Sequence, residues 1–401
     1  MRDPRGTAPS ERPSRPRRRN HGPLRLHRAH PPAPLPRRPA APRSPHVSDE
    51  TTPAAPAVAK PPQKRRVSLA LQGGGTHGAF TWGVLERLLE DERLEVDGLS
   101  GTSAGAINGA MLVQGLLEGG PEAAIAALDR FWRSIAQRLS MSPVQATPFE
   151  KLVWGHDLTW SFAYRTFDTL SRVLSPYQLN PFPIDFNPLR DALTDSIDFE
   201  RLRMEAKAPR LFVSATSVRT GKPRVFTRRE VTVEALLASA CLPQVFKAVE
   251  IDGEPFWDGG YLGNPALWPL YDQGGPPDIV LIQLNPQFRE EHPTSVSDIV
   301  NRLNEITFNG SLMAEMRAID FVQRLLDTGR LEQPRYRRLF VHLIEDEDRL
   351  RGFKLSTKFN GDWEFLCMLR QYGREAAEAW IAEHFDKLGR ESSVDIRARF
   401  L

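Results

Sequence analysis

Cysteine and long apolar runs are both scarce in this sequence. Cys241 and Cys367 are the only cysteines among 401 residues, so neither a disulfide framework nor a cysteine-based metal site is expected. No run of about 18 apolar residues occurs, and we therefore expect no transmembrane helix. No apolar segment of about 7–15 residues follows the N-terminal arginines, so no secretory signal peptide is expected. These absences favour a cytoplasmic protein, with peripheral contact to a membrane left open.

Acidic residues are few at the N-terminus. Residues 1–66 contain 16 Lys and Arg against 4 Asp and Glu, together with 16 of the 34 prolines. A stretch of this composition cannot bury enough apolar surface to offset the entropy lost on ordering, so we expect a disordered tail. Its basic clusters could touch anionic lipid headgroups, but a solvated tail is favoured and nucleic acid is not an expected partner.

A serine lies between two glycines in the sequence Gly101-Thr-Ser103-Ala-Gly105. A short strand is predicted over residues 94–99, and a run of small residues over 104–113 suits a tightly packed helix. A turn of this kind exposes the serine hydroxyl at a helix N-terminus, where the unpaired N–H groups favour developing negative charge. The pattern predicts a nucleophile, although a glycine-rich turn that merely contains a serine would look the same.

A second glycine-rich loop, Gly73-Gly74-Gly75-Thr-His-Gly78, follows a predicted strand at 67–71 and precedes a predicted helix. The backbone N–H groups of these four glycines can converge on a substrate oxygen as an oxyanion hole. The loop also fits the dinucleotide pattern G-x-G-x-x-G, with Asp97 about 20 residues further on. A nucleotide-binding oxidoreductase is therefore an alternative. It leaves the serine turn unexplained, whereas a hydrolase accounts for both loops.

A base for the serine is offered by Asp258, which is followed by Gly259 and Gly260. An aspartate with an ordinary pKa of about 3.9 is a weak base, but burial beside the neighbouring aromatic residues would raise that pKa. A Ser–Asp dyad would then be workable. The alternative is a triad with a histidine, for which the chain order Ser103, Asp258 and then a histidine would fit. The histidines that follow Asp258 in that order, none with a supporting motif, are His292, His342 and His384.

The rest of the chain predicts one α/β domain over residues 67–401, with the motifs in 67–284 and a mainly helical part in 285–401. Strand–helix units in succession indicate a mainly parallel sheet covered by helices. Nine aromatic residues fall between Phe149 and Phe186, broken by prolines. Such a segment forms either a plug of the core or a lid and apolar wall of a substrate site.

The three motifs, in this order, resemble those of the patatin-like phospholipase family. The segments 238–243 and 263–265 also look like family segments, and the resemblance runs from about residue 67 to 284. It implies a three-layer α/β/α fold and a Ser103–Asp258 dyad that cleaves lipid acyl esters through an acyl-enzyme, without metal or cofactor. A catalytically silent lipid-surface protein is the further alternative. One departure concerns His77, because family members usually carry Arg or Lys there. A histidine supplies a cation only below its ordinary pKa of about 6.5.

Overall fold

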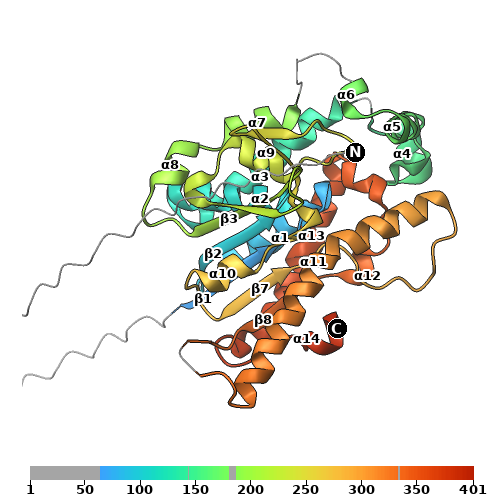
Figure 1. Ribbon diagram of the computed structural model, residues 1–401. Coiled ribbons are helices and arrows are strands. Elements are labelled where there is room, and N and C mark those ends of the chain that lie inside the picture. The colour runs from blue at the N-terminus through green and yellow to red at the C-terminus, as the bar shows by residue number, and fades with distance from the viewer. Residues whose placement is uncertain (1–63, 143, 180–186, 333–334) are drawn as a thin grey trace, which may run out of the picture. The chain divides into compact units, whose positions relative to one another are not determined.

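The computed structural model describes residues 64–401 except 143, 180–186 and 333–334 (Figure 1). The predicted tail lies outside the described residues up to residue 63. Its last residues, Arg65 and Arg66, already belong to the first strand, so regular structure begins two residues earlier than expected. The described residues lie within one compact unit, Lys60–Leu401.

The core of the fold is a sheet whose strands run in the order β5-β6-β3-β2-β1-β7-β8, with β4 paired to β3. Five neighbouring strands are parallel: β1 (Arg65–Leu71), β2 (Leu94–Thr102), β3 (Arg210–Ser217), β7 (Asp278–Ile282) and β8 (Phe340–Ile344). Three pair antiparallel: β4 (Pro223–Thr227), β5 (Val249–Ile251) and β6 (Glu254–Asp258). The expected mainly parallel sheet is confirmed.

Helices cover both faces of this sheet (Figure 1). Successive residues of a strand point to opposite faces, so Leu69 and Leu71 of β1 join one apolar cluster and Ala70 joins the other. The first cluster is shared with α1 (Gly78–Leu89), α2 (Ala104–Gly119), α3 (Pro121–Ser140), α7 (Pro188–Ser196), α9 (Val233–Ser239) and α13 (Trp363–His384). The second is shared with α10 (Trp268–Asp272), α11 (Val296–Asp327) and α14 (Ile396–Phe400). The three-layer α/β/α fold is confirmed.

The remaining helices are short. They are α4 (Pro148–Trp154), α5 (Phe162–Val173), α6 (Pro176–Leu179), α8 (Phe199–Met204) and α12 (Glu347–Leu350). The 3₁₀ turns are η1 (Gly75–His77), η2 (Leu158–Trp160), η3 (Arg228–Glu230), η4 (Gly259–Tyr261), η5 (Leu355–Phe359) and η6 (Phe385–Lys387). No helix in the described part of the chain has both the length and the apolar character needed to cross a bilayer.

The three predicted motifs meet at one edge of the sheet. Because β1 and β2 are parallel and adjacent, the glycine loop after β1 and the serine turn after β2 emerge side by side. Asp258 ends β6 and pairs with Ala215, next to the position where Thr102 pairs with Ser214 on the other side of β3. The topology therefore brings residues 73–78, 103 and 258 together.

Candidate active site

Ser103 occupies the sharp turn between β2 and α2, with φ 53° and ψ −124°. A non-glycine residue rarely adopts a positive φ, and such strain is typical of functional positions. The turn is tight enough that a Cβ at Gly105 would lie 2.2 Å from the Leu71 carbonyl oxygen, and one at Gly101 2.6 Å from the Ala106 nitrogen. Both glycines are therefore required by close approach of the backbone.

Asp258 is 1% exposed, and its Oδ1 accepts a 2.7 Å hydrogen bond from the Gly260 N–H. Burial raises its pKa to about 7, against the opposing effects of the Gly260 hydrogen bond, a hydrogen bond with the Ser103 side chain, and the charge of Lys358. A carboxyl group with a pKa near neutrality is suited to general-base catalysis at that pH. A Cβ at Gly259 would lie 2.2 Å from the Ser214 carbonyl oxygen, so this turn also needs its glycine.

The glycine loop offers fewer free donors than the sequence suggests. The Gly73 N–H donates to Asn264 Oδ1 at 2.7 Å, and the Gly78 N–H to carbonyl oxygens within the loop. Gly78 also allows α1 to approach α2, since a Cβ there would lie 2.7 Å from the Ala104 Cβ. Among the described residues, no acceptor takes the N–H of Gly74 or Gly75. The expected four donors are thus reduced to these two, because the fold itself occupies the others.

Polar side chains beneath the loop fix its position. Gln72 Oε1 accepts hydrogen bonds from the backbone N–H of Leu284 at 2.9 Å and of Asn285 at 3.0 Å. Gln72 Nε2 donates to Asn309 Oδ1 at 3.1 Å, and Asn285 Nδ2 donates to the Gly73 carbonyl oxygen at 3.0 Å. Sequence reasoning missed Asn285, although it follows the parallel strand β7, whose carboxyl end meets the same sheet edge. Asn309, within α11, carried no such signal.

A lysine that no motif predicted lines the same pocket as Ser103 and Asp258. Lys358, in η5, donates a 2.7 Å hydrogen bond from Nζ to Asn285 Oδ1. It lies about 100 residues beyond Asp258, in an irregular segment where no periodicity or spacing could single it out. Burial lowers its pKa to about 8.

His77 does not supply a cation. The residue is 3% exposed, and its Nε2 lies 2.8 Å from Thr357 Oγ1. Burial, and then the charge of Lys358, lower its pKa to about 3. The imidazole is therefore neutral at any pH at which Asp258 is ionised. A protonated His77, considered from the sequence, is excluded in the pH range where the candidate base can work.

The histidines of the alternative triad lie elsewhere. His342 is buried on β8 with Nε2 3.1 Å from Asp278 Oδ1, and Asp278 begins β7 at the sheet edge opposite to Ser103. His384 ends α13 and its ring contacts Trp380. Neither these two nor His292 is among the residues lining the pocket that holds Ser103. The triad thus lacks a histidine near the serine.

The dinucleotide alternative fails at Asp97. A ribose-binding acid belongs at the carboxyl end of its strand, near the glycine loop. Asp97 instead lies in the amino-terminal half of β2, where it forms ion pairs with Arg66 and, at 2.5 Å, with Arg210. Residues 73–78 therefore match the G-x-G-x-x-G pattern without forming a dinucleotide site.

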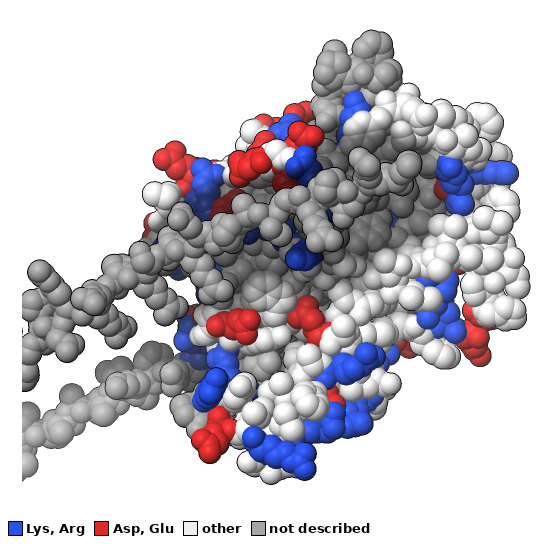
Figure 2. All heavy atoms as spheres, viewed as in Figure 1, with Lys and Arg blue, Asp and Glu red and all other residues white. Residues whose placement is uncertain are grey.

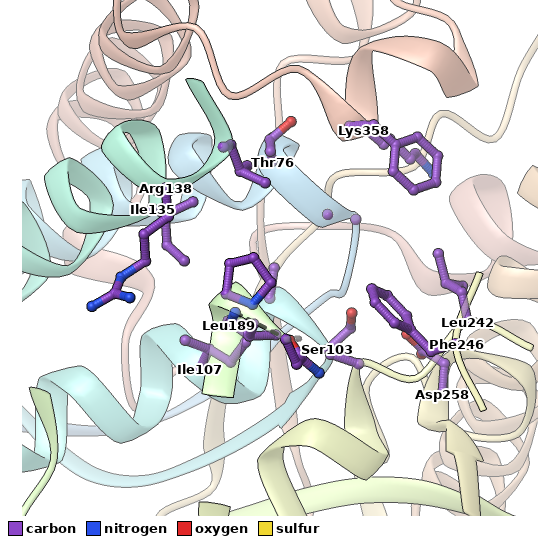
Figure 3. A pocket seen from close by; sticks show the side chains of 18 of the residues that line it. Thr76, Ser103, Ile107, Ile135, Arg138, Leu189, Leu242, Phe246, Asp258 and Lys358 are labelled. Atoms are coloured by element: carbon purple, nitrogen blue, oxygen red, sulfur yellow. Dashed lines mark hydrogen bonds between the residues drawn. The ribbon is translucent and has the colours of Figure 1, made fainter. Parts of the chain in front are cut away.

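The candidate site opens into an apolar cavity of about 230 Å³. Figure 3 shows Ile107, Ile135 and Leu189 on one side of Ser103, and Leu242 and Phe246 on the other. Such a wall, with few polar groups near the serine, suits an extended hydrocarbon chain whose reactive group meets Ser103 and Asp258.

The chain matches a family model and is similar to solved structures. A family model described as patatin-like phospholipase matches residues 69–271. No curated protein matches the chain. The structure of VipD from Legionella pneumophila is similar to that of this chain. The aligned region covers 84% of this chain and 73% of VipD, with 15% sequence identity and a TM-score of 0.38. The structure of the type III effector protein ExoU is also similar, over a region that covers 80% of this chain, with 14% sequence identity and a TM-score of 0.32. Another structure contains ExoU in complex with SpcU, from Pseudomonas aeruginosa. The chain spans about half of ExoU, 53%.

Proposed function

Because this chain belongs to the patatin-like phospholipase family, we propose that it hydrolyses lipid acyl esters in the manner of a phospholipase A, with Ser103 as nucleophile and Asp258 as base. The observation that carries the proposal is that Ser103 and the buried Asp258 carboxyl line the same apolar cavity, close enough for the Ser103 side chain to influence the pKa of Asp258. The strained backbone of Ser103 supports the same role, because strain of this kind is typical of functional positions.

In the proposed acylation step, the Asp258 carboxylate takes the proton of the Ser103 hydroxyl while Oγ attacks the carbonyl carbon of the ester. The carbonyl oxygen becomes negatively charged and accepts hydrogen bonds from the N–H groups of Gly74 and Gly75. The C–O bond to the alcohol then breaks, and Asp258 returns the proton to the leaving oxygen. The acyl group stays on Ser103.

In the proposed deacylation step, water takes the place of the alcohol. Asp258 accepts a proton from the water, whose oxygen attacks the acyl carbon, and the same two glycines stabilise the charge that develops. The bond to Ser103 Oγ then breaks, Oγ regains its proton from Asp258, and the fatty acid leaves. Both steps use only groups of this chain, without a metal or cofactor.

A lipid surface is the proposed source of the substrate. Apolar side chains of α4 and α5 lie on the surface, where Phe149 is 71%, Leu152 84% and Phe162 82% exposed. This region is largely uncharged (Figure 2, upper right). On its inner side, α5 packs the ring of Tyr164 against Phe359, which lines the cavity. We propose that this apolar surface, residues 149–173, contacts the lipid aggregate from which the acyl chain enters.

We further propose that residues 67–401 act as one catalytic domain. The part beyond residue 284 is not a separate unit, because β8 extends the sheet beside β7 and α13 packs on α1. It also contributes Lys358 and Phe308 to the cavity. The predicted aromatic segment contacts this domain where Tyr164 packs against Phe359. Residues 180–186 of the segment lie outside the described part of the chain.

The test is turnover of a p-nitrophenyl acyl ester. We expect Ser103→Ala and Asp258→Asn each to abolish it, since removing the nucleophile or the base of a concerted pair costs most of the catalysis. Alanine at His292, His342 or His384 should leave the rate unchanged. Full activity in Ser103→Ala contradicts the mechanism, and a histidine variant as inactive as Ser103→Ala contradicts the dyad.

A further inference from the structure

Lys358 is a cation inside the site that is bound by amides rather than by a carboxylate. Its Nζ donates to Asn285 Oδ1 at 2.7 Å and lies 3.5 Å from Asn304 Oδ1. None of the described carboxylates comes within ion-pair distance of it. Burying an ammonium group is costly unless it is paired, and here only the more distant carboxylates of Glu305 and Asp258 offset its charge.

A chain of hydrogen bonds links this ammonium group to the glycine loop. An ammonium group only donates, so the Asn285 atom facing it is the oxygen, and the Asn285 nitrogen is left to donate to the Gly73 carbonyl oxygen at 3.0 Å. The Gly73 carbonyl and the Gly74 N–H belong to the same peptide group. Each bond in the chain points the same way, and aligned bonds polarise one another. The positive end of this chain is the N–H of Gly74.

The peptide segment that carries Lys358 is fixed directly on the loop. Thr76 Oγ1 donates to the Thr357 carbonyl oxygen at 2.8 Å, and His77 Nε2 contacts Thr357 Oγ1 at 2.8 Å. A Cβ at Gly75 would lie 2.5 Å from the Lys358 carbonyl oxygen. In this chain, the residue at position 77 therefore holds η5 in place and carries no charge of its own.

We propose that Lys358 supplies the positive charge of the oxyanion site, acting through Asn285 and the Gly73–Gly74 peptide, in the place of the Arg or Lys expected at position 77. This inference rests on the proposed hydrolase function. Lys358 is a positioning and polarising residue, because it acts through other groups. It lies beyond residues 69–271, the part of the chain that the family model matches.

The charge of Lys358 depends on pH within the working range. Burial lowers its pKa to about 8, with Glu305 of α11 and Asp258 opposing and Arg289 assisting that shift. The ammonium form is present below that pH and is lost above it. Asp258, with a pKa of about 7, is a base only above that value. The rate should therefore rise as pH passes about 7 and fall as pH passes about 8.

The experiment compares kcat, KM and the pH profile of the full chain with those of Lys358→Met and Lys358→Arg. We expect Lys358→Met to lower kcat about tenfold to a hundredfold, less than the loss of a direct donor, with KM little changed. The alkaline limb near pH 8 should disappear in Lys358→Met and move to higher pH in Lys358→Arg. The matched control is Lys354→Met, because Lys354 Nζ lies at the surface, 3.4 Å from Asp157 Oδ2. This variant should keep the kcat and the pH profile of the unmodified chain.

Two results overturn the inference while the proposed function stands. One is a kcat of Lys358→Met equal to that of the unmodified chain. The other is an alkaline limb that stays at its original pH in Lys358→Met or Lys358→Arg, which would indicate a packing role only. Should Lys358→Met not fold, the Lys358→Arg profile decides. An unmodified chain without any esterase activity that Ser103→Ala removes would refute the proposed function itself, and this inference with it.

Discussion

Asn264 accepts a 2.7 Å hydrogen bond at Oδ1 from the backbone N–H of Gly73. This bond ties the glycine loop after β1 to the segment that follows Asp258, so two motifs almost 200 residues apart hold one another in place. The side chain is fully buried, and its Nδ2 has no partner among the described residues. The fold thus tolerates one unsatisfied donor in order to place one acceptor at Gly73.

Replacing Asn264 by Ala should loosen the loop. The Gly73 N–H would be left buried without an acceptor, which costs about 1–3 kcal/mol of unfolding free energy. We expect kcat to fall as well, because Gly74 and Gly75 lose their fixed direction. Chemical denaturation and ester turnover measure the two effects. Ser295→Ala removes the N-cap of α11 at a cost of about 1 kcal/mol and serves as the control, with kcat retained. An equal kcat in both variants would contradict this role of Asn264.

Asp258→Asn should make the protein inactive and, at alkaline pH, more stable. Because the folded pKa of Asp258 is about 7 and its ordinary value 3.8, the folded state holds this proton more tightly. Stability is therefore lost as pH rises from about 4 to 7, and the amide escapes this loss. We expect Asp258→Asn to be more stable by roughly 2–4 kcal/mol at pH 8.5 and about equal at pH 4. Thermal or urea unfolding at both pH values checks this. A variant less stable at pH 8.5 would show that the carboxylate is not penalised by burial.

Gly75→Ala should disturb the contact between η1 and η5. Gly75 has φ 59°, and an added Cβ would lie 2.5 Å from the Lys358 carbonyl oxygen. Gly221 has a nearly identical φ of 62°, but nothing lies within 4 Å of an added Cβ. Both variants should lose about 1 kcal/mol from the strained backbone. Only Gly75→Ala should also lose activity, by tenfold or more if the donor moves by about 1 Å. Equal kcat in both variants would contradict the proposed loop geometry.

The apolar surface of residues 149–173 should matter for aggregated substrates only. We expect Leu152→Ser with Phe162→Ser to weaken binding to phospholipid vesicles and to slow hydrolysis of vesicle lipid severalfold, since less apolar area enters the interface. Turnover of a short water-soluble ester should stay the same. Met204→Ser, at a residue 78% exposed on α8, is the control for general loss of apolar surface. Vesicle cosedimentation that is unchanged in the double variant would refute the proposed contact.

The sequence was sufficient to predict the parts of the site that follow strands. The loop Gly73–Gly75 follows β1 and Ser103 follows β2, and such ends of adjacent parallel strands meet by topology alone. Asp258 was predicted from its glycine-flanked turn. Its burial and raised pKa depend on the surrounding packing, for example that of Phe308 of α11 against Gly260, which sequence spacing does not encode.

The sequence could not predict which N–H groups remain available, because this depends on long-range partners such as Asn264. It could not predict Lys358 or its link through Asn285 either. Those contacts join η5 to the end of β7 across 73 residues, and neither segment has a pattern that names the other. The charge state of His77 was likewise left open, because a pKa of about 3 follows from burial and from the nearby Lys358 rather than from residue type.

The central claim is that Ser103 is the nucleophile, and labelling with a fluorophosphonate probe tests it most directly. The probe phosphonylates an activated serine, and mass spectrometry of the digested protein locates the adduct. We predict one adduct on the peptide that carries Ser103, none in Ser103→Ala, and much slower labelling in Asp258→Asn. Ser239, whose hydroxyl accepts the Ser103 N–H at 2.8 Å, should stay unlabelled. A folded, unlabelled protein, or an adduct on another serine that persists in Ser103→Ala, would contradict the account.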